Sequence, residues 1–313
     1  MRWTTKARIQ NLISKLPSGL SYTAYYGLQR KFGRLREFEF PRKIRAASEI
    51  WSRIEKQGRD PKGGVFFEVG TGWVPVVPLT FWLMGAERTI TVDLNPYVRP
   101  KLVEEALQFL VEKPKRVRSI LDGRLDEARY EKAISLLEQR PFSMERFYDE
   151  CGIEYRAPSD ASATGLDDDC IDFHVSFVVL EHIPPGVVKG IFEEGNRIVK
   201  PDGLFVHLID YSDHFAHTDK TITVINFLQY SDEEWDRFAS NRYMYMNRLR
   251  HDDYQEIFQN VGHQVVETEP VTDERAEILL SSGTFPITKR FASKDHEILA
   301  IKNSWFVSRP ESP

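Results

Sequence analysis

Two glycines and two acidic residues occur at a spacing that suits a ligand containing a nucleoside. The apolar run VFFEV, residues 65–69, contains Glu68 and is followed by Gly70 and Gly72, and a second apolar run ends at Asp93. The first glycine allows a tight turn after a strand, and the second lets the backbone approach a ligand closely. An acid about 20 residues further on can accept hydrogen bonds from ribose hydroxyls. This stretch therefore predicts a nucleoside-binding turn.

Two kinds of cofactor compete for this turn. Proteins that bind dinucleotides usually have the pattern GxGxxG, which places the pyrophosphate at a helix N-terminus. In this chain Pro75 stands in the place of the third glycine. Glu68 would repel a pyrophosphate and attract a cationic amino-acid moiety. S-adenosylmethionine carries an ammonium and a sulfonium and no phosphate, so the charges favour it. An NAD(P)-dependent oxidoreductase is the alternative, and a turn without any ligand is the third interpretation.

A second set of polar residues follows two later apolar runs. His182 comes after the run at 171–180, and Asp210 ends the run at 204–210, shortly before His214 and His217. Methyl transfer to an oxygen or nitrogen benefits from a base, so these four residues are the candidate catalytic groups. In contrast, a histidine inside an apolar run, such as His207, is expected to be a buried core residue.

Candidate acceptor-binding residues lie in the same part of the chain. Asp213 belongs to the run DHFAH, and Tyr243, Arg248 and Arg250 belong to the segment NRYMYMNRLR. Side chains of these types can hydrogen-bond sugar hydroxyls or a phosphate. The alternative for the second segment is an amphipathic helix with its apolar side in the core. Because the D-H-x-x-H run has no clear metal-ligand spacing, we expect no metal site.

Alternating strand and helix patterns must position these residues. Short runs rich in β-branched and aromatic residues indicate buried parallel strands at 65–69, 89–94, 171–180 and 204–210. A further strand is expected near Ile153. Helical patterns lie between the runs, at 75–85, 97–112 and 186–199. This alternation predicts a doubly wound α/β fold.

The chain is expected to have a helical leading segment, residues 1–60, and a sheet-containing domain, residues 61–313. Apolar spacing predicts a helix at 5–16, a short second helix, and another helix at 42–57. Two insertions exceed ordinary connections: a charged helical one at about 113–150 and an aromatic, polar one at about 211–250. Long insertions at strand ends in this architecture commonly lie at the ligand crevice.

The charge of the 313-residue chain is unevenly distributed. Residues 1–45 carry eleven Lys/Arg and two Asp/Glu, a balance of +9, so the remainder carries −14 of the total of −5. An acidic total argues against a nucleic-acid binder. The basic segment suggests contact with an anionic partner such as a membrane surface, and a solvated helical face is the alternative. Since the chain has no secretory signal pattern and no spanning apolar run, the cytoplasm is its expected location.

The combination of motifs resembles class I S-adenosylmethionine-dependent methyltransferases. EVGTG, VDL, SDA, LDDDCIDFHVSFVVLEHIPP and KPDG follow one another over roughly residues 60–270, and the usual third glycine of the first motif is Val74. The resemblance implies a Rossmann-like, mostly parallel seven-stranded sheet and S-adenosylmethionine as the cofactor. The implied contacts are Glu68, Gly70, Thr71 and Gly72 with the methionine moiety, Asp93 with the ribose, Leu94, Asp160 and Ala161 with the adenine, and Phe177 to Leu180, including Val178, as the wall near the sulfonium.

A narrower resemblance concerns the acceptor. FFEVGTGxVPxxPLxFWLxGA, TVDLNPY, VLEHIPP and IDYSDHFAH are similar to bacterial methyltransferases that accompany polysaccharide or other glycan biosynthesis. The resemblance implies transfer of a methyl group to a hydroxyl of a sugar, glycan or other small molecule. A further hypothesis is a non-catalytic, membrane-associated partner that keeps the fold and uses its basic segment as the contact.

Overall fold

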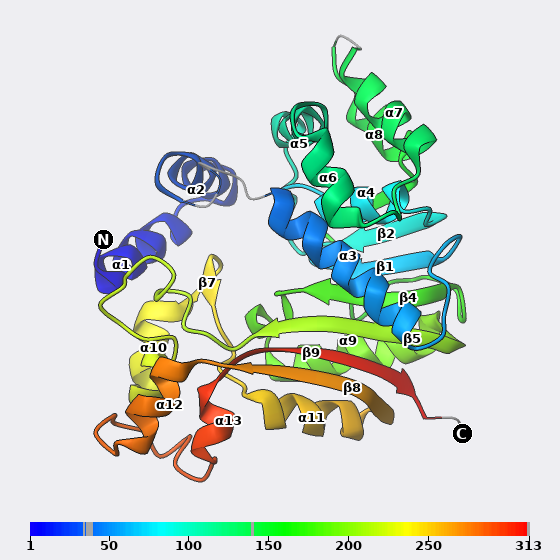
Figure 1. Ribbon diagram of the computed structural model, residues 1–313. Helices are drawn as coiled ribbons and strands as arrows, with labels where there is room; N and C mark the ends of the chain where they lie inside the picture. Colours follow the sequence, from blue (N-terminus) through cyan, green and yellow to red (C-terminus); the bar gives the residue numbers. More distant parts are fainter. Residues whose placement is uncertain (34, 36–39, 139–140, 312–313) are drawn as a thin grey trace. The chain divides into compact units, whose positions relative to one another are not determined.

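The computed structural model describes residues 1–33, 35, 40–138 and 141–311 (Figure 1). The chain divides into two compact units. Unit 1 comprises Met1–Glu37, Val178–Lys189 and Leu208–Phe306, and unit 2 comprises Phe38–Phe177, Gly190–His207 and Val307–Pro313. The described residues contain no helix that is both long and apolar enough to cross a bilayer.

A seven-stranded sheet runs through the described residues in the order β3-β2-β1-β4-β5-β9-β8. Its strands are β1 (Val65–Val69), β2 (Arg88–Val92), β3 (Ile153–Arg156), β4 (Ile171–Phe177), β5 (Val199–Asp210), β8 (His263–Thr272) and β9 (Ile301–Pro310). β1 pairs in parallel with β2 and β4, and β2 pairs in parallel with β3. The first five strands have the order of doubly wound folds, in which ligands bind where the order reverses, here between β1 and β4. The predicted doubly wound, mostly parallel seven-stranded sheet is confirmed.

Aromatic side chains of unit 2 attach helices to both faces of β1. Phe66 stacks on Trp51 of α3 (Phe40–Lys56), with 6.0 Å between the ring centroids. Phe67 contacts His174 at 5.1 Å, and His174 lies 6.3 Å from Phe192 of α9 (Pro185–Ile198). Because successive residues of a strand face opposite sides, α3 and α9 cover opposite faces of the sheet.

The remaining helices of unit 2 include those of the helical insertion predicted at about 113–150, which begin at Pro114. They are α4 (Val76–Leu83), α5 (Pro100–Glu112), α6 (Pro114–Leu121), α7 (Glu127–Ser135), the 3₁₀ turn η1 (Leu136–Glu138) and α8 (Met144–Glu150). Residues 139–140 of the insertion lie outside the described residues. The helices predicted at 42–57, 75–85, 97–112 and 186–199 correspond to α3, α4, α5 and α9.

Unit 1 joins the start of the chain to the aromatic insertion. Its helices are α1 (Trp3–Ser14), α2 (Ser18–Phe32), α10 (Asp232–Ala239), α11 (His251–Asn260), α12 (Glu274–Ser281) and α13 (His296–Ala300), with the 3₁₀ turns η2 (Leu180–His182) and η3 (Asn226–Gln229). Trp3 packs 5.3 Å from Phe215 and 6.3 Å from Trp235, and its backbone N–H donates to Asp219 at 2.8 Å. α1 is therefore part of the core of unit 1. Arg34 and Arg36 of the basic segment lie outside the described residues.

The units divide the chain differently from the predicted boundary at residue 60. α3, which was expected in the leading segment, belongs to unit 2 because its face packs on β1. The helix considered for the segment 241–250 is also wrong. β6 (Ser240–Asn241) and β7 (Met244–Tyr245) form an antiparallel pair there, followed by irregular chain up to α11. Met244 and Met246 are buried on either side of the half-buried Tyr245, an alternation that suits extended chain.

Candidate functional site

The turn after β1 has the backbone that only glycine adopts readily. Gly70 and Gly72 have φ of 88° and 70°, in the left-handed region. The backbone N–H groups of Gly70 and Thr71 donate to the carbonyl of Val92, at 2.8 and 3.3 Å. The hydroxyl of Thr71 is buried against that of Thr91 at 2.6 Å. The backbone N–H and the side chain of Thr71 are therefore both engaged by β2 in this structure.

Asp93, directly after β2, is oriented by backbone donors and keeps acceptor capacity. One carboxylate oxygen accepts from the N–H of Gly72 and the other from the N–H of Asn95, each at 2.9 Å. A carboxylate has about four lone-pair positions, so about two stay available for a ligand. The next residue, Leu94, is 64% exposed, although it is a large apolar side chain. This pairing suits a ribose at Asp93 and an apolar ring on Leu94.

Lys43 of α3 is a residue of this turn that sequence reasoning missed. Its ammonium donates to the carbonyl oxygens of Thr71 and Val74, at 3.3 and 3.4 Å. Burial lowers the pKa of Lys43, while the charges of Glu68 and Asp93 act in the opposite direction. Burial likewise raises the pKa of Asp93. One cation and two acids therefore meet at the glycine turn. Nothing in the spacing distinguishes Lys43 from the other basic residues of its segment.

Glu68 lies under the turn and is buried. Its carboxylate accepts from the hydroxyl of Thr91 at 2.5 Å, so the hydroxyl oxygen of Thr91 accepts in turn from Thr71. Burial raises the pKa of Glu68 to about 7, although Lys43 and Thr91 both lower it. In this structure the carboxylate of Glu68 acts on the turn through the hydroxyl of Thr91 and through the charge of Lys43.

A Glu68→Gln variant should change how stability depends on pH. A carboxyl group with a pKa raised from 4.5 to about 7 takes up a proton on folding, so the free energy of unfolding falls as pH rises through this window. The slope from one such group is at most about 1.4 kcal/mol per pH unit. Urea unfolding at several pH values should show a flatter profile for Glu68→Gln. The exposed Glu87 provides the control, and equal slopes in Glu68→Gln and Glu87→Gln would contradict the expectation.

The segment around Asp160, which is expected to contact the adenine, is hydrogen-bonded to Asp93 through the main chain. The N–H of Ser159 donates to the carbonyl of Asp93 at 2.9 Å. Asp160 is exposed, and one of its oxygens accepts from the N–H and the hydroxyl of Ser162, at 2.8 and 2.7 Å. Ala161 is buried beside it. Eight residues expected at the cofactor lie in unit 2, Glu68 on β1 and the others on the turns that follow β1, β2 and β3: Gly70, Thr71, Gly72, Asp93, Leu94, Asp160 and Ala161.

Val178, also expected at the cofactor, has an unusual backbone. It follows β4 directly, belongs to unit 1 and has a φ of 52°. Its N–H donates to the carbonyl of Leu208 at 2.9 Å, which helps to hold this conformation. A β-branched residue in the left-handed region is unfavourable by about 1–2 kcal/mol. Such strain is concentrated at functional sites.

Three of the four candidate catalytic residues meet at the end of β5, in unit 1. Nε2 of His214 lies 3.4 Å from Oδ2 of Asp210, and Nε2 of His217 lies 3.9 Å from the same oxygen. Oδ1 of Asp210 accepts from the N–H and hydroxyl of Ser212, at 2.9 and 2.5 Å. Burial alone would raise the pKa of Asp210, but hydrogen bonds from His214 and Ser212 hold it well below its usual range.

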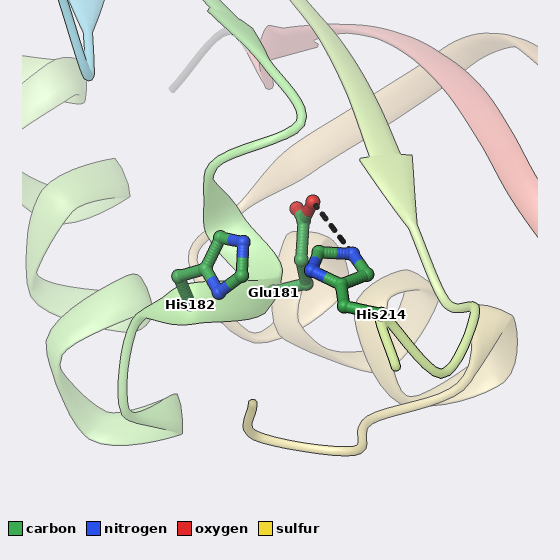
Figure 2. Close-up of side chains that lie close together, drawn as sticks. All are labelled: Glu181, His182 and His214. Atoms are coloured by element: carbon green, nitrogen blue, oxygen red, sulfur yellow. Dashed lines mark ion pairs between the residues drawn. The ribbon is translucent and has the colours of Figure 1, made fainter. Parts of the chain in front are cut away.

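The fourth candidate, His182, lies against the same histidine. The rings of His182 and His214 are 4.7 Å apart in a T-shaped arrangement. Oε1 of Glu181, the residue before His182, lies 4.0 Å from Nε2 of His214 (Figure 2). Glu181 is 2% exposed, whereas His182 is exposed. Sequence reasoning missed Glu181 because a glutamate before a predicted helix is ordinarily a surface residue.

Asp213 and Arg250, which were expected to bind the acceptor, are buried and hydrogen-bonded within unit 1. Asp213 is fully buried and accepts from the N–H of Phe215 at 2.8 Å and from the amide of Asn226 at 2.9 Å. Burial raises the pKa of Asp213 to about 6. Arg250 is also fully buried and donates to backbone carbonyl oxygens, those of Tyr211 and Leu299 at 2.8 Å and that of Ile301.

Arg248 and Tyr243 are likewise engaged within unit 1. Arg248 is buried, donates to the carbonyl of Tyr230 at 2.8 Å and pairs with Asp232. The guanidinium of Arg248, which was expected to bind the acceptor, is therefore engaged within unit 1 in this structure. Tyr243 stacks on Tyr25 of α2 at 3.8 Å, and its hydroxyl lies 2.6 Å from that of Ser21. These contacts attach the β6–β7 pair to α2, and they engage both the ring and the hydroxyl of Tyr243.

His207 is confirmed as a buried core histidine of unit 2. Its side chain is fully buried on β5, and Nδ1 lies 2.8 Å from the hydroxyl of Ser176 on β4. His174 lies 3.4 Å from its other ring nitrogen. A histidine inside an apolar strand is thus satisfied by polar neighbours on adjacent strands.

Comparisons with known proteins give structural neighbours only. No protein-family model and no curated protein matches the chain. A protein from Pyrococcus horikoshii is 12% identical and covers 91% of this chain and 99% of its own, with a TM-score of 0.48. The 1,6-didemethyltoxoflavin-N1-methyltransferase of Burkholderia thailandensis, solved with S-adenosylhomocysteine, is 12% identical and covers 94% and 89%, with a TM-score of 0.47. The geranyl diphosphate C-methyltransferase of Streptomyces coelicolor is 10% identical and covers 85% and 80%, with a TM-score of 0.47. Likenesses of this size carry no argument about activity.

Proposed function

We propose that this protein transfers a methyl group from S-adenosylmethionine to a hydroxyl of a sugar, glycan or other small molecule. The observation that carries the proposal is the geometry of Asp93. Its carboxylate is held by the N–H groups of Gly72 and Asn95 and keeps acceptor positions for the two ribose hydroxyls. It also stands beside the strand at which the sheet order reverses, where doubly wound folds bind ligands.

The charges at the turn support the choice of cofactor. A cation, Lys43, and two acids, Glu68 and Asp93, meet there. S-adenosylmethionine presents an α-carboxylate, an ammonium and ribose hydroxyls. We assign Lys43 to the carboxylate, Asp93 to the ribose, and Leu94, Asp160 and Ala161 to the adenine.

Methyl transfer is an in-line displacement in which the acceptor oxygen bonds to the methyl carbon as the carbon–sulfur bond breaks. Most of the rate enhancement comes from positioning the reacting atoms. We assign activation of the acceptor to the side chains gathered at the end of β5 and at η2, which include Asp210, His182, His214 and His217. The choice of a hydroxyl rests on the resemblance of the motifs to glycan-associated methyltransferases.

Calorimetric titration with S-adenosylmethionine and S-adenosylhomocysteine tests the proposal. The wild-type chain should bind one equivalent of each with micromolar dissociation constants. Leu94→Ser should weaken binding about tenfold, because the adenine loses an apolar surface. Val111, another exposed apolar residue of unit 2, provides the matched control. No binding to the wild-type chain, or equal affinities for Leu94→Ser and Val111→Ser, would contradict the proposal.

We propose in addition that α1 and α2 contact an anionic membrane surface. Large apolar side chains of these helices and of the link between them are exposed: Leu12 by 71%, Leu16 by 41%, Leu20 by 65% and Phe32 by 69%. Arg8 of α1, Lys15 directly after α1 and Lys31 of α2 are also exposed. Exposed apolar residues beside basic ones are typical of segments that lie on anionic lipid.

Vesicle sedimentation tests this contact. The chain should bind vesicles that contain anionic lipid, and binding should weaken as salt is raised. Leu20→Ser combined with Phe32→Ser should reduce binding at least about fivefold, since the buried apolar area is lost. Ile278 of α12, which is 71% exposed, provides the control. Equal binding by the double variant and by Ile278→Ser would refute the proposed contact.

A further inference from the structure

Glu181, His182 and His214 bring three potential metal ligands together in unit 1. One ligand atom from each side chain lies within 4.8 Å of the other two. The first two residues belong to the turn η2 and the third to the loop after β5, so the fold creates the cluster (Figure 2). We propose that this cluster binds a divalent transition-metal ion such as Zn²⁺.

The hydrogen bond made by His182 prepares it as a ligand. Its Nδ1 lies 2.7 Å from the carbonyl oxygen of Tyr245, which can only accept a hydrogen bond. Nδ1 therefore carries the proton, and the lone pair of the neutral ring lies on Nε2. Histidines that bind metals usually donate their second N–H to a carbonyl or carboxylate in this way.

The imidazole of His214 faces two carboxylates at distances that leave room for an ion. Its Nε2 lies 4.0 Å from Oε1 of Glu181 and 3.4 Å from Oδ2 of Asp210. In a tetrahedral site with bonds of about 2.1 Å, neighbouring ligand atoms are roughly 3.4 Å apart. Side-chain movements of about 1 Å would bring the three ligands to that spacing. Asp210, whose other oxygen is fixed by Ser212, is positioned to be a fourth ligand.

Charge also favours a cation at this place. Glu181 is 2% exposed, and a buried carboxylate is unfavourable unless a positive charge or hydrogen bonds offset its loss of water. A divalent ion would compensate Glu181 and Asp210 together. Two imidazoles with a carboxylate suit Zn²⁺, Fe²⁺ or Mn²⁺, whereas Mg²⁺ and Ca²⁺ favour sites made of oxygen. Three protein ligands leave a coordination position for water or for an oxygen of a substrate.

The sequence predicted no metal site because the run DHFAH was considered by itself. Only His214 of that run belongs to the cluster, since Asp213 is buried in hydrogen bonds to Phe215 and Asn226. The other two ligands lie more than thirty residues earlier in the chain. The inference does not depend on the identity of the cofactor in unit 2.

Titration of the chelator-stripped full chain with Co²⁺ tests the inference, with visible absorption as the readout and Zn²⁺ as the competitor. One equivalent of Co²⁺ should give absorption bands that Zn²⁺ removes, while Mg²⁺ should leave them unchanged. His182→Ala and Glu181→Gln should each weaken Zn²⁺ binding at least about tenfold. His296→Ala, which removes an exposed histidine elsewhere, is the control and should bind as the wild type does.

Absence of the Co²⁺ bands in the wild-type chain would overturn the inference. Equal affinities for His182→Ala and His296→Ala would do the same. If Glu181→Gln fails to fold, His182→Ala decides the question, because His182 is exposed. Calorimetry with S-adenosylhomocysteine on the same stripped samples separates the proposals. Normal binding of S-adenosylhomocysteine without binding of a metal would contradict the metal site alone. Binding of a metal without binding of S-adenosylhomocysteine would contradict the proposed function alone.

Discussion

An Asp93→Asn variant is expected to bind S-adenosylmethionine at least about 100-fold more weakly than the wild-type chain. In our assignment, the carboxylate accepts from both ribose hydroxyls while the N–H groups of Gly72 and Asn95 hold it in place. Hydrogen bonds to a charged acceptor contribute about 1.5–3 kcal/mol each, and 2.7 kcal/mol corresponds to about a 100-fold change in affinity. Isothermal titration calorimetry measures the change directly.

An analogue of S-adenosylhomocysteine without the ribose 2′-hydroxyl provides the control for Asp93→Asn. The wild-type chain should bind this analogue more weakly than the parent ligand. The variant should show a much smaller difference, because the acceptor of that hydroxyl is already changed. Thermal unfolding of both proteins identifies any general loss of stability. If the missing 2′-hydroxyl weakens binding to Asp93→Asn as much as it weakens binding to the wild-type chain, Asp93 does not bind the ribose.

Arg250→Met is expected to lower the free energy of unfolding by about 3–5 kcal/mol, as for a buried charged group whose hydrogen-bond partners are left unsatisfied. The fully buried guanidinium donates to the carbonyls of Tyr211, Leu299 and Ile301 and lies 5.3 Å from the ring of Tyr211. Methionine fills similar space but leaves these oxygens without their donor. Urea unfolding should show a much lower midpoint.

Arg242→Met is the matched control for Arg250→Met. Arg242 is an exposed arginine of the same segment and lies over the ring of Tyr22 at 5.8 Å. Its substitution should change stability by no more than about 1 kcal/mol. If both variants unfold at the same urea concentration, Arg250 does not hold unit 1 together as described.

The fold was predictable because local patterns encode it. Runs of β-branched and aromatic residues mark buried strands, and the alternation of strands with helical segments implies parallel pairing. The glycine turn was also predictable, since Gly70 and Gly72 stand where the backbone must adopt positive φ. The position of Asp93 was predictable as well, because this residue directly follows the apolar run of β2. These features depend on neighbours in sequence, so a single chain reveals them.

The remainder of the site depends on contacts between distant segments. Lys43 reaches the turn from α3, and Glu181 meets His214 from a different loop. Polar residues are normally expected at the surface, so the burial of Asp213 and Arg250 could not be read from their types. Their partners are carbonyls and amides of other segments, which leave no pattern in the sequence.

A comparison of two ligands distinguishes S-adenosylmethionine from a dinucleotide as the cofactor of this protein. Thermal unfolding of the wild-type chain should be measured with S-adenosylhomocysteine and with NADH at equal concentrations. S-adenosylhomocysteine should raise the melting temperature by several degrees, because a ligand that binds only the folded state stabilises it. NADH should leave the melting temperature unchanged, since Pro75 stands where a dinucleotide-binding turn has its third glycine. Stabilisation by NADH alone would contradict the account and indicate an oxidoreductase.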